Sequence, residues 1–428
     1  MMAASLLFLG FLALMVLGAP LAVALGLAGT VAIFEAQLGI LSVPTNIYAG
    51  IAKYPLLAIP VFILAGLIFE RVGVAKQIVT FASSLVGAKN GGLAVVAILV
   101  CMVMGGISGS GPADAAAVAT VMIPSMHRAG YPKAFSASVI AAAAATAILI
   151  PPSVAFIIYS VLVPAASVPA LFSAGLIPGV LAGLSLLVPT IWLARKHGFG
   201  LADTGPRPPI WQSFKGAIWG LLAPFIILGG LRAGIFTPTE AAVVAVFYGL
   251  AVGLFVYRTL TWRVLYEVLA EAAEMSAVVL LIIALSSVFA WAGSTLGAFD
   301  AVAQAAMEAT GNEIIVLLLL NLALLGLGML LDAVSVFLIL LPLLTPIMEA
   351  FRWDPVWFGV MLTMNLAIGQ FTPPMAVNLM VTARVANISI ESTVRWTLWM
   401  VLAMVVALMA VTFVPELSLW LPRQLGYV

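Results

Sequence analysis

Apolar runs of about twenty residues recur along almost the whole chain, and they constrain the fold more than any other feature. A transmembrane helix needs roughly 20 consecutive apolar residues, whereas a membrane strand needs about ten with alternating polarity. Only 8% of the 428 residues are charged, which excludes an ordinary soluble globular protein. The runs lie near residues 5–33, 54–70, 92–108, 113–126, 134–165, 169–193, 216–234, 237–257, 276–292, 313–331, 333–350, 356–386 and 390–414. The sequence therefore predicts an all-α polytopic membrane protein.

The run at 5–33 is too long and too smoothly continued for a cleaved signal peptide, so it is expected to be the first span. Two amphipathic, charge-bearing segments, 71–89 and 259–275, are expected between the other runs. The single cysteine, Cys101, lies inside an apolar run and excludes a disulfide framework. His127 and His197 stand beside basic residues at run ends, where an interfacial position is expected rather than a metal site.

The two halves of the chain resemble each other. A polar linker, 195–215, divides the chain near its middle. A shift of 222 residues superposes several landmarks: Asn90 on Asn312, Gly106 on Gly328, Pro124 on Pro346, Pro151-Pro152 on Pro373-Pro374, and Ser167 on Ser389. These matches predict an internal duplication, with a first repeat at 1–194 and a second at 216–428.

Basic residues predict how the halves are oriented, because cytoplasmic loops of membrane proteins are enriched in Lys and Arg. The stretch 293–351 contains no Lys or Arg and several acidic residues, so it is expected outside. The matching region of the first half and the central linker carry basic residues, namely Arg71, Lys76, Lys89, Arg128, Lys133, Arg195, Lys196, Arg207 and Lys215. The halves are therefore expected to be inverted, with a cytoplasmic N-terminus and a periplasmic C-terminus.

Each half contains a pair of apolar runs joined without room for a proper loop. Residues 92–127 are predicted to form a re-entrant hairpin from the inside, with the tip "GGISGSGPAD". Residues 313–350 are predicted to form its counterpart from the outside, with the tip "GLGMLLDAVS" (Gly326–Ser335). A helix broken at a double proline follows each hairpin, at 134–165 and at 356–386. Interrupted hydrophobic segments at matching positions of two halves indicate a transporter's binding site.

The breaks and tips offer oxygen ligands and helix N-termini. Proline removes a hydrogen-bond donor, so carbonyls before each Pro-Pro pair are left free, and glycines and hydroxyls add further neutral oxygens. Such clusters suit Na⁺, and the half-helix N-termini suit a carboxylate. Predicted Na⁺-site residues are Gly106, Ser108, Ser110, Pro151, Gly328, Asp332, Thr372 and Pro374. Predicted substrate-binding residues are Ser153, Thr372 and Asn378. No catalytic residue is predicted.

Purely structural roles are the alternative at these positions. A proline kink or a glycine-rich crossing in a membrane helix commonly serves only packing. Asp114, in the first turn after Pro112, could either cap that helix or function at the tip, and both alternatives stay open. Asp332 is assigned to a cation site or to locking the outer tip. Glu240 in "TPTEAA" is expected to complete a capping box with Thr237, and Arg232 to be interfacial.

Five motifs in matching order and spacing resemble one family over nearly the whole chain. They are "GGISGSGPADAAAVATVMIP", "LIPPSVAFIIY", "GIFTPTEAAVVAV", "GMLLDAVSVFLILLPLLTPI" and "TPPMAVNLMV". Together they are similar to the large membrane subunit (M-type) of tripartite ATP-independent periplasmic (TRAP) transporters. The chain departs from that family at Ala376, where glycine is frequent, and at Ala155 and Ser160, where proline and glycine are common.

The resemblance implies a sodium-driven secondary transporter in the bacterial inner membrane that moves organic anions such as carboxylates or sugar acids. It further implies two partners, a small four-helix membrane subunit and a soluble periplasmic binding protein, and an ion-transporter-like fold of the elevator type. No four extra helices precede residue 5, so the unfused form is expected. Na⁺ is the expected coupling ion. The sequence has no Walker A motif and no nucleophile–base pair, so neither an enzyme, an organic cofactor nor a nucleic-acid partner is expected. The alternative is a stand-alone ion-coupled anion carrier with the same inverted-repeat architecture.

Overall fold

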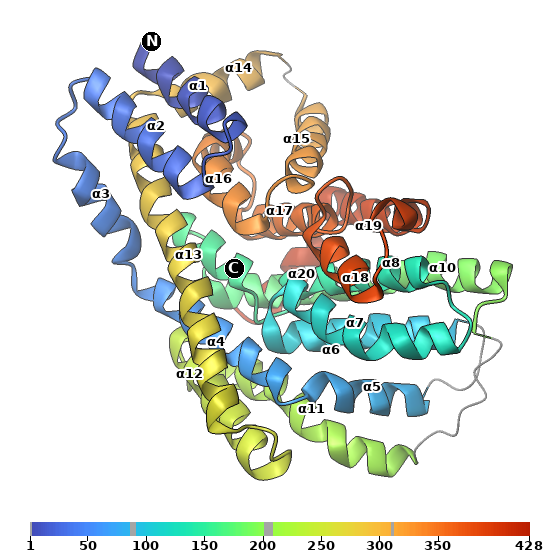
Figure 1. The fold of residues 1–428 in the computed structure, drawn as a ribbon. Helices are drawn as coiled ribbons and strands as arrows, with labels where there is room; N and C mark the ends of the chain where they lie inside the picture. Colours follow the sequence, from blue (N-terminus) through green and yellow to red (C-terminus); the bar gives the residue numbers. More distant parts are fainter. Residues whose placement is uncertain (1, 86–90, 201–208, 310–311) are drawn as a thin grey trace.

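The computed structural model describes residues 2–85, 91–200, 209–309 and 312–428. All regular elements in these ranges are helices, and none is a strand (Figure 1). Lys89, Asn90 and Arg207, which contribute to the predicted repeat and topology, lie outside the described residues.

The first apolar run forms two helices, so the prediction of a single span across 5–33 is wrong. α1 (Met2–Val16) and α2 (Leu21–Glu35) pack against each other as a hairpin. The chain turns at Gly18, whose φ of +81° favours glycine, and Pro20 has no amide hydrogen to continue a helix. The predicted cytoplasmic side of the N-terminus stays a prediction.

One group of helices surrounds the long helix α13, which runs down one side of the molecule in Figure 1. α13 contacts α2, α3 and α4, while α12 packs on α4 and α11 on α5. The predicted amphipathic segment 259–275 is continuous with the following span as the first half of α13. The members are α1, α2, α3 (Ser42–Ile51), η1 (Tyr54–Leu57), α4 (Ala58–Arg71), α5 (Val74–Leu85), α11 (Ile210–Arg232), α12 (Pro238–Ala251), η3 (Val252–Val256), α13 (Trp262–Thr295) and α14 (Ala298–Ala309). We call this set the frame group.

The second group contains the hairpins and the broken helices. Its first part comprises α6 (Gly92–Ser108), α7 (Gly111–Arg128), α8 (Lys133–Ala144), η2 (Ala145–Ile148), α9 (Val154–Leu162) and α10 (Val168–His197). Its second part comprises α15 (Glu313–Gly328), α16 (Ala333–Ala350), α17 (Pro355–Gly369), α18 (Val377–Ala386), η4 (Glu391–Thr393), α19 (Val394–Phe413) and α20 (Glu416–Gln424). We call this set the hairpin group.

The shift of 222 residues seen in the sequence also relates helix boundaries in the hairpin group. It maps the start of α7 at Gly111 onto the start of α16 at Ala333, and the start of α8 at Lys133 onto that of α17 at Pro355. The ends of α7 and α16, Arg128 and Ala350, correspond in the same way. The proposed repeat boundaries, 1–194 and 216–428, stay a prediction, because these matches concern only the hairpins and the helices directly after them.

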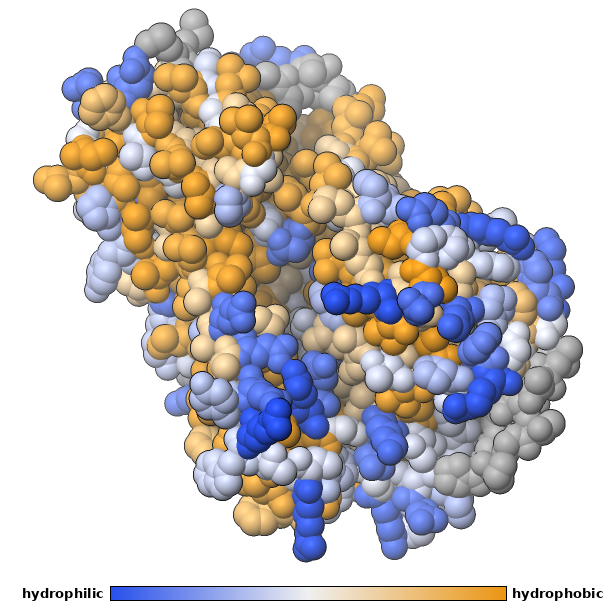
Figure 2. All heavy atoms as spheres, viewed as in Figure 1, coloured by the Kyte–Doolittle hydropathy of each residue, from blue (hydrophilic) through white to orange (hydrophobic). Residues whose placement is uncertain are grey.

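Seven helices in the described ranges are long and apolar enough to cross a membrane. The hairpin helix α16 is one of these seven, whereas the other hairpin helices and the broken half-helices, with 9 to 18 residues, are not among them. Figure 2 shows hydrophobic side chains spread over the upper left of the molecule, where α1 to α3 lie, and hydrophilic ones gathered elsewhere. The predicted class is confirmed: an all-α polytopic membrane protein with two helical hairpins and two broken helices.

Candidate functional site

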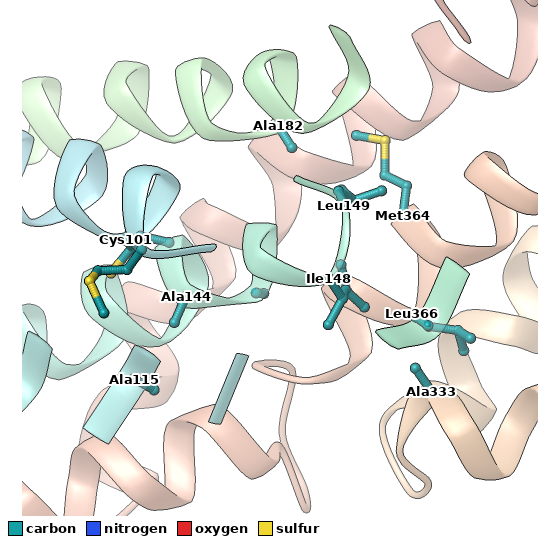
Figure 3. Packing of buried hydrophobic residues seen from close by; sticks show 14 of the residues in the cluster. Cys101, Ala115, Ala144, Ile148, Leu149, Ala182, Ala333, Met364 and Leu366 are labelled. Atoms are coloured by element: carbon teal, nitrogen blue, oxygen red, sulfur yellow. The ribbon is translucent and has the colours of Figure 1, made fainter. Parts of the chain in front are cut away.

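The tips of the two hairpins meet at one cavity of about 220 Å³. The inner hairpin contributes Ser108 to Ala113 and the outer hairpin Asp332 to Val334, and the first and second breaks add Ile148 and Gln370. Ile148 and Ala333 of the outer hairpin both line the cavity, and Figure 3 shows them in the same part of the view as Leu366 of the second broken helix. The frame group closes one wall with Ile63, Gly66, Leu67, Met275 and Val279. Segments far apart in sequence therefore form a single site.

The inner tip is organised by Ser108 and Asp114. The hydroxyl of Ser108 donates to Asp114 Oδ1 at 2.7 Å and accepts from the amide of Ser110 at 3.1 Å. Asp114 is 1% exposed, and its second oxygen, Oδ2, has no hydrogen-bond partner among the described residues. The side chain of Asp114 thus bonds Ser108 and accepts no hydrogen bond from a backbone amide of α7 among the described residues, while its functional role at the tip stays a prediction.

A glycine lets the inner tip approach the first break closely. Gly109 has φ +62°, and a Cβ at this position would lie 2.3 Å from the carbonyl oxygen of Pro152. Ser153 donates its hydroxyl to the Ile148 carbonyl at 2.6 Å and accepts from the Phe156 amide at 3.4 Å. Ser153 therefore satisfies a carbonyl at the break and caps α9. Both double prolines, Pro151-Pro152 and Pro373-Pro374, have cis peptide bonds.

The second break touches the start of the inner hairpin. A Cβ on Gly111 would lie 2.5 Å from Gln370 Oε1 and 3.0 Å from Asn378 Nδ2. Asn378 donates to the Ala141 carbonyl at 3.3 Å and to Gln370 Oε1 at 3.4 Å, while its own Oδ1 has no partner among the described residues. The hydroxyl of Thr372 donates to the Ile368 carbonyl at 2.6 Å. The two halves of the hairpin group thus interlock through polar side chains.

The outer tip is fixed by Asp332. Its carboxylate accepts from the amides of Val334 and Ser335, at 3.1 Å and 3.4 Å, and from the Ser335 hydroxyl. It therefore caps α16, which agrees with the tip-locking alternative. Gly328, at the end of α15, packs directly on Gly369 at the end of α17.

Three helices begin at this cavity. The first residues of α7, α9 and α16 line it, namely Gly111, Pro112 and Ala113, then Val154 and Ala155, then Ala333 and Val334. The N-terminus of a helix carries a partial positive charge and amides without intrahelical partners. Asp332 and Ser153 already occupy amides of α16 and α9, while the cap residue of α7, Ser110, makes no side-chain cap hydrogen bond. The arrangement favours an anionic group at the cavity, with hydroxyl and backbone oxygens of the tips around it.

Comparison with known proteins identifies the family. The family model described as the DctM component of tripartite ATP-independent periplasmic transporters matches residues 8–417. The chain belongs to the DctM family. This agrees with the resemblance found in the sequence motifs, and it identifies the protein as a large membrane component of a transporter rather than an enzyme.

Two relatives within the DctM family match along nearly their whole length, and a third is longer than this chain. The C4-dicarboxylate TRAP transporter large permease protein DctM of Rhodobacter capsulatus is 36% identical, with 99% of this chain and 100% of that protein covered. The sialic acid TRAP transporter large permease protein SiaM of Vibrio cholerae is 37% identical, with 98% of each covered. The chain spans 65% of the isethionate TRAP transporter permease protein DctMQ of Oleidesulfovibrio alaskensis, at 38% identity and 96% coverage of this chain.

A solved structure shares the fold. The Alcanivorax borkumensis YdaH transporter superposes with a TM-score of 0.66 over 90% of this chain and 89% of that chain. The sequence identity is 15%, so the likeness concerns the fold alone.

The predicted site residues of this DctM-family chain fall into separate places. Ser108, Ser110 and Asp332 line the cavity between the tips. Ser153, Thr372 and Asn378 are buried just behind it, and Gly328 lies at the crossing with Gly369. Gly106 and Pro151 line a different, apolar cavity of about 620 Å³ beside α11, and Pro374 is exposed. The ion-binding and substrate-binding roles of all these residues stay predictions.

Other residues of the site were missed by the sequence. Gln370 lines the cavity and contacts Asn378, and its position three residues before Pro373 was the available signal. Outside the cavity lining, Asn365 and Asn321 form a buried pair between α17 and α15, in which Nδ2 of Asn365 donates to Oδ1 of Asn321 at 2.9 Å. The signal for such a pair is an amide side chain inside an apolar helix, because a polar group in the membrane is costly unless it is paired.

Two further sequence features can be compared with the structure. The capping box of Thr237 and Glu240 is present at the start of α12, as predicted. Ala376, where the family often has glycine, has φ +44°, in the left-handed region that glycine adopts without strain. The frequent glycine is thus explained by the backbone conformation at the start of α18.

Proposed function

We propose that this chain is the large membrane subunit of a sodium-coupled importer of organic anions, such as carboxylates or sugar acids. The anion is delivered by a periplasmic binding protein, and a small four-helix membrane subunit completes the complex. The protein resides in the bacterial inner membrane and needs no organic cofactor.

The observation that carries the proposal is the convergence of three helix N-termini on the cavity between the hairpin tips. A helix N-terminus stabilises an anion through its dipole and its free amides. Asp332 is the acidic lining residue, and its carboxylate is engaged with two amides and a hydroxyl. The names of the relatives, which include a C4-dicarboxylate and a sialic acid transporter, support a carboxylate substrate.

Sodium is the proposed coupling ion because the tips offer neutral oxygens with few carboxylates. Ser108, Ser110 and the backbone around Gly109 supply such oxygens at the inner tip. Asp114 lies next to this cluster, and its Oδ2 has no hydrogen-bond partner among the described residues, so a cation at the inner tip would meet a carboxyl oxygen that could complete its ligands. Hard cations such as Na⁺ prefer this type of ligand over nitrogen or sulfur.

We further propose that the hairpin group slides as a unit against the frame group, as in an elevator. Helices pack extensively within each group, and the groups meet at contacts such as those of α5 with α6 and of α13 and α14 with α16; the cavity lies where the hairpin tips face α4 and α13 of the frame. Gly66 of α4 packs on Ser108 of the inner tip, where an added Cβ would lie 3.2 Å from the Ser108 carbonyl oxygen. Lys53 links the groups by donating to the Val161 carbonyl at 3.1 Å. Few such polar links would have to break during sliding.

The test is uptake of a labelled dicarboxylate or sugar acid into liposomes that contain this chain and the small subunit, with the binding protein added outside. Uptake should collapse when external sodium is replaced by choline at constant pH. Uptake that is unchanged in choline and is driven by a proton gradient alone would contradict sodium coupling.

Uptake experiments that omit a partner distinguish the proposed complex from the alternative, a stand-alone carrier. Without the small subunit or the binding protein, high-affinity uptake by this chain should be negligible. The candidate site is a cavity of about 220 Å³ between the hairpin tips, and capture of dilute substrate is the role proposed for the binding protein. Robust sodium-dependent uptake by the chain alone would show that the stand-alone alternative is correct.

A further inference from the structure

A groove runs between α10 and α19 of the hairpin group. It has a volume of about 450 Å³, within the roughly 300–1,000 Å³ of typical ligand sites. Val188, Pro189 and Trp192 of α10 form one wall, and Trp399, Leu402 and Val406 of α19 form the other. None of these residues lines the cavity between the tips.

The walls of the groove are exposed and apolar. Val188 is 72% exposed and Val406 64% exposed among the described residues. In a bilayer such side chains face the acyl chains of lipids, so the groove offers an apolar hollow to a chain lying along the helices.

One end of the groove is cationic. A second hollow, of about 540 Å³, shares Val188 and Trp192 with the groove and extends to Arg195 and Lys196. The ammonium of Lys196 lies 4.8 Å from the ring centroid of Trp192, which in turn lies 5.0 Å from the ring centroid of Trp399. Neither Arg195 nor Lys196 forms an ion pair with a carboxylate in the described ranges.

The start of α19 adds to this positive end. Arg395 lies over the ring of Trp396, at 4.5 Å from its centroid. The ring of Trp396 in turn lies 5.3 Å from the ring of His197, which follows Lys196 in α10. Indole rings below a row of cations are typical of the level at which lipid headgroups meet the hydrocarbon core.

The length of the groove fits one leaflet. Ten residues of α10 separate Ser185, at the apolar end, from Arg195, which at about 1.5 Å per residue is roughly 15 Å. The hydrocarbon core of a bilayer is about 30 Å thick, so the groove reaches from the headgroup level to about its middle.

We propose that this groove is a binding site for an anionic phospholipid. One acyl chain lies between α10 and α19 on the indoles of Trp192 and Trp399. The phosphate accepts hydrogen bonds from Arg195 and Lys196, the pairing that guanidinium and ammonium groups form with phosphate. The site lies within the hairpin group and is separate from the proposed ion and anion sites, so it does not depend on the proposed function.

The test is lipid binding by the purified full chain, titrated with phosphatidylglycerol or phosphatidylcholine of identical acyl chains and followed by native mass spectrometry. The double variant Arg195→Gln/Lys196→Gln should weaken phosphatidylglycerol binding about 25-fold, since each cation near an anionic lipid contributes about fivefold. Phosphatidylcholine binding should change little. The matched control, Arg128→Gln/Lys133→Gln, removes the same charge from other helix ends and should leave both lipids unaffected.

A second variant examines the apolar part of the site. Ala403→Phe fills the groove without touching the cations, and it should reduce binding of both lipids at least tenfold. Val180→Phe, on the exposed face of α10 outside the groove, is its control. Each variant is first shown to keep the thermal unfolding transition of the parent chain.

Four results would overturn the proposal. Equal affinity of the parent chain for the two lipids would show that the cations do not select an anionic headgroup. An equal loss of phosphatidylglycerol affinity in the Arg128/Lys133 control would show that Arg195 and Lys196 act only through the overall charge of the protein. Unchanged binding in Ala403→Phe, or full competition by inorganic phosphate alone, would show that no acyl chain occupies the groove.

Discussion

The two glycines that cross at the outer tip, Gly328 and Gly369, should respond differently to the same substitution. A Cβ on Gly369 would lie 2.4 Å from the carbonyl carbon and oxygen of Gly328, which are backbone atoms that cannot rotate away. A Cβ on Gly328 would lie 3.4 Å from its nearest neighbour, the Cα of Gly369, which is ordinary contact. The pair therefore provides a test and its control within one helix crossing.

The expected magnitudes come from these distances. Carbon atoms pack best at about 3.5–4.0 Å, so Gly369→Ala forces α15 and α17 apart by about 1 Å. Overpacking lowers the free energy of unfolding by about 1–3 kcal/mol, whereas replacing glycine by alanine within a helix raises it by about 0.5–1 kcal/mol. Gly369→Ala should lose about 0.5–2 kcal/mol of stability, and Gly328→Ala should be neutral or slightly stabilising.

Transport should report the same difference more sharply. Gly369 directly precedes Gln370, and Gly328 ends the helix that leads to Asp332, so both cavity-lining residues move when the crossing opens. A shift of about 1 Å costs about 100-fold at catalytic sites, and we expect a loss of at least tenfold in sodium-dependent uptake for Gly369→Ala. Gly328→Ala keeps its backbone carbonyl and should transport normally.

The measurement compares thermal unfolding in detergent with uptake in liposomes at equal reconstituted amounts. Equal effects of the two alanines, or normal uptake by Gly369→Ala, would refute the geometry of this crossing. The inner hairpin offers an independent repetition. A Cβ on Gly105 would lie 2.6 Å from the Ala147 Cα, whereas one on Gly106 would lie 3.4 Å from the Pro224 side chain. Gly105→Ala should therefore be the damaging member of that pair.

Two further predictions concern single side chains. Asp114→Asn can still accept the Ser108 hydroxyl but removes a carboxylate that could ionise beside a bound cation, so sodium-dependent uptake should need a higher sodium concentration for half-maximal rate. An unchanged sodium titration would leave Asp114 with a purely structural role. Ala376→Gly should stabilise the chain by about 0.5–1 kcal/mol in thermal unfolding, because the left-handed backbone at this position costs alanine about 1–2 kcal/mol. The greater conformational entropy that glycine loses on folding offsets about 0.5–1 kcal/mol of this gain. The control Ala383→Gly, inside α18, should instead destabilise by about 0.5–1 kcal/mol.

The local devices of the site could be predicted because their causes lie in neighbouring residues. A double proline ends a helix wherever it occurs, since it lacks the amide hydrogen, and both breaks lie at Pro151-Pro152 and Pro373-Pro374 as expected. The capping box at Thr237 arises in the same way from residues three positions apart.

A local signal was also available where the prediction failed. Gly18 and Pro20 interrupt the first apolar run, but hydropathy alone does not separate one long span from two short helices, and tertiary packing decided for the hairpin of α1 and α2. The amphipathic segment 259–275 likewise continues into the following span as one helix, α13. One of its charged residues, Glu271, forms a salt bridge with Arg71 of α4 at 2.7 Å.

What only the tertiary structure decided is which segments meet. The sequence by itself determined the membrane class, the hairpins, the breaks and the family. It did not place Gly111 against Gln370 and Asn378, or bring the starts of α7, α9 and α16 to one cavity. The physical reason is that lipid is as apolar as a protein core, so the buried face of a membrane helix carries no hydrophobic stripe to mark it. Its neighbours are chosen by close packing of small residues and by scattered polar contacts, which become visible only when the helices are docked.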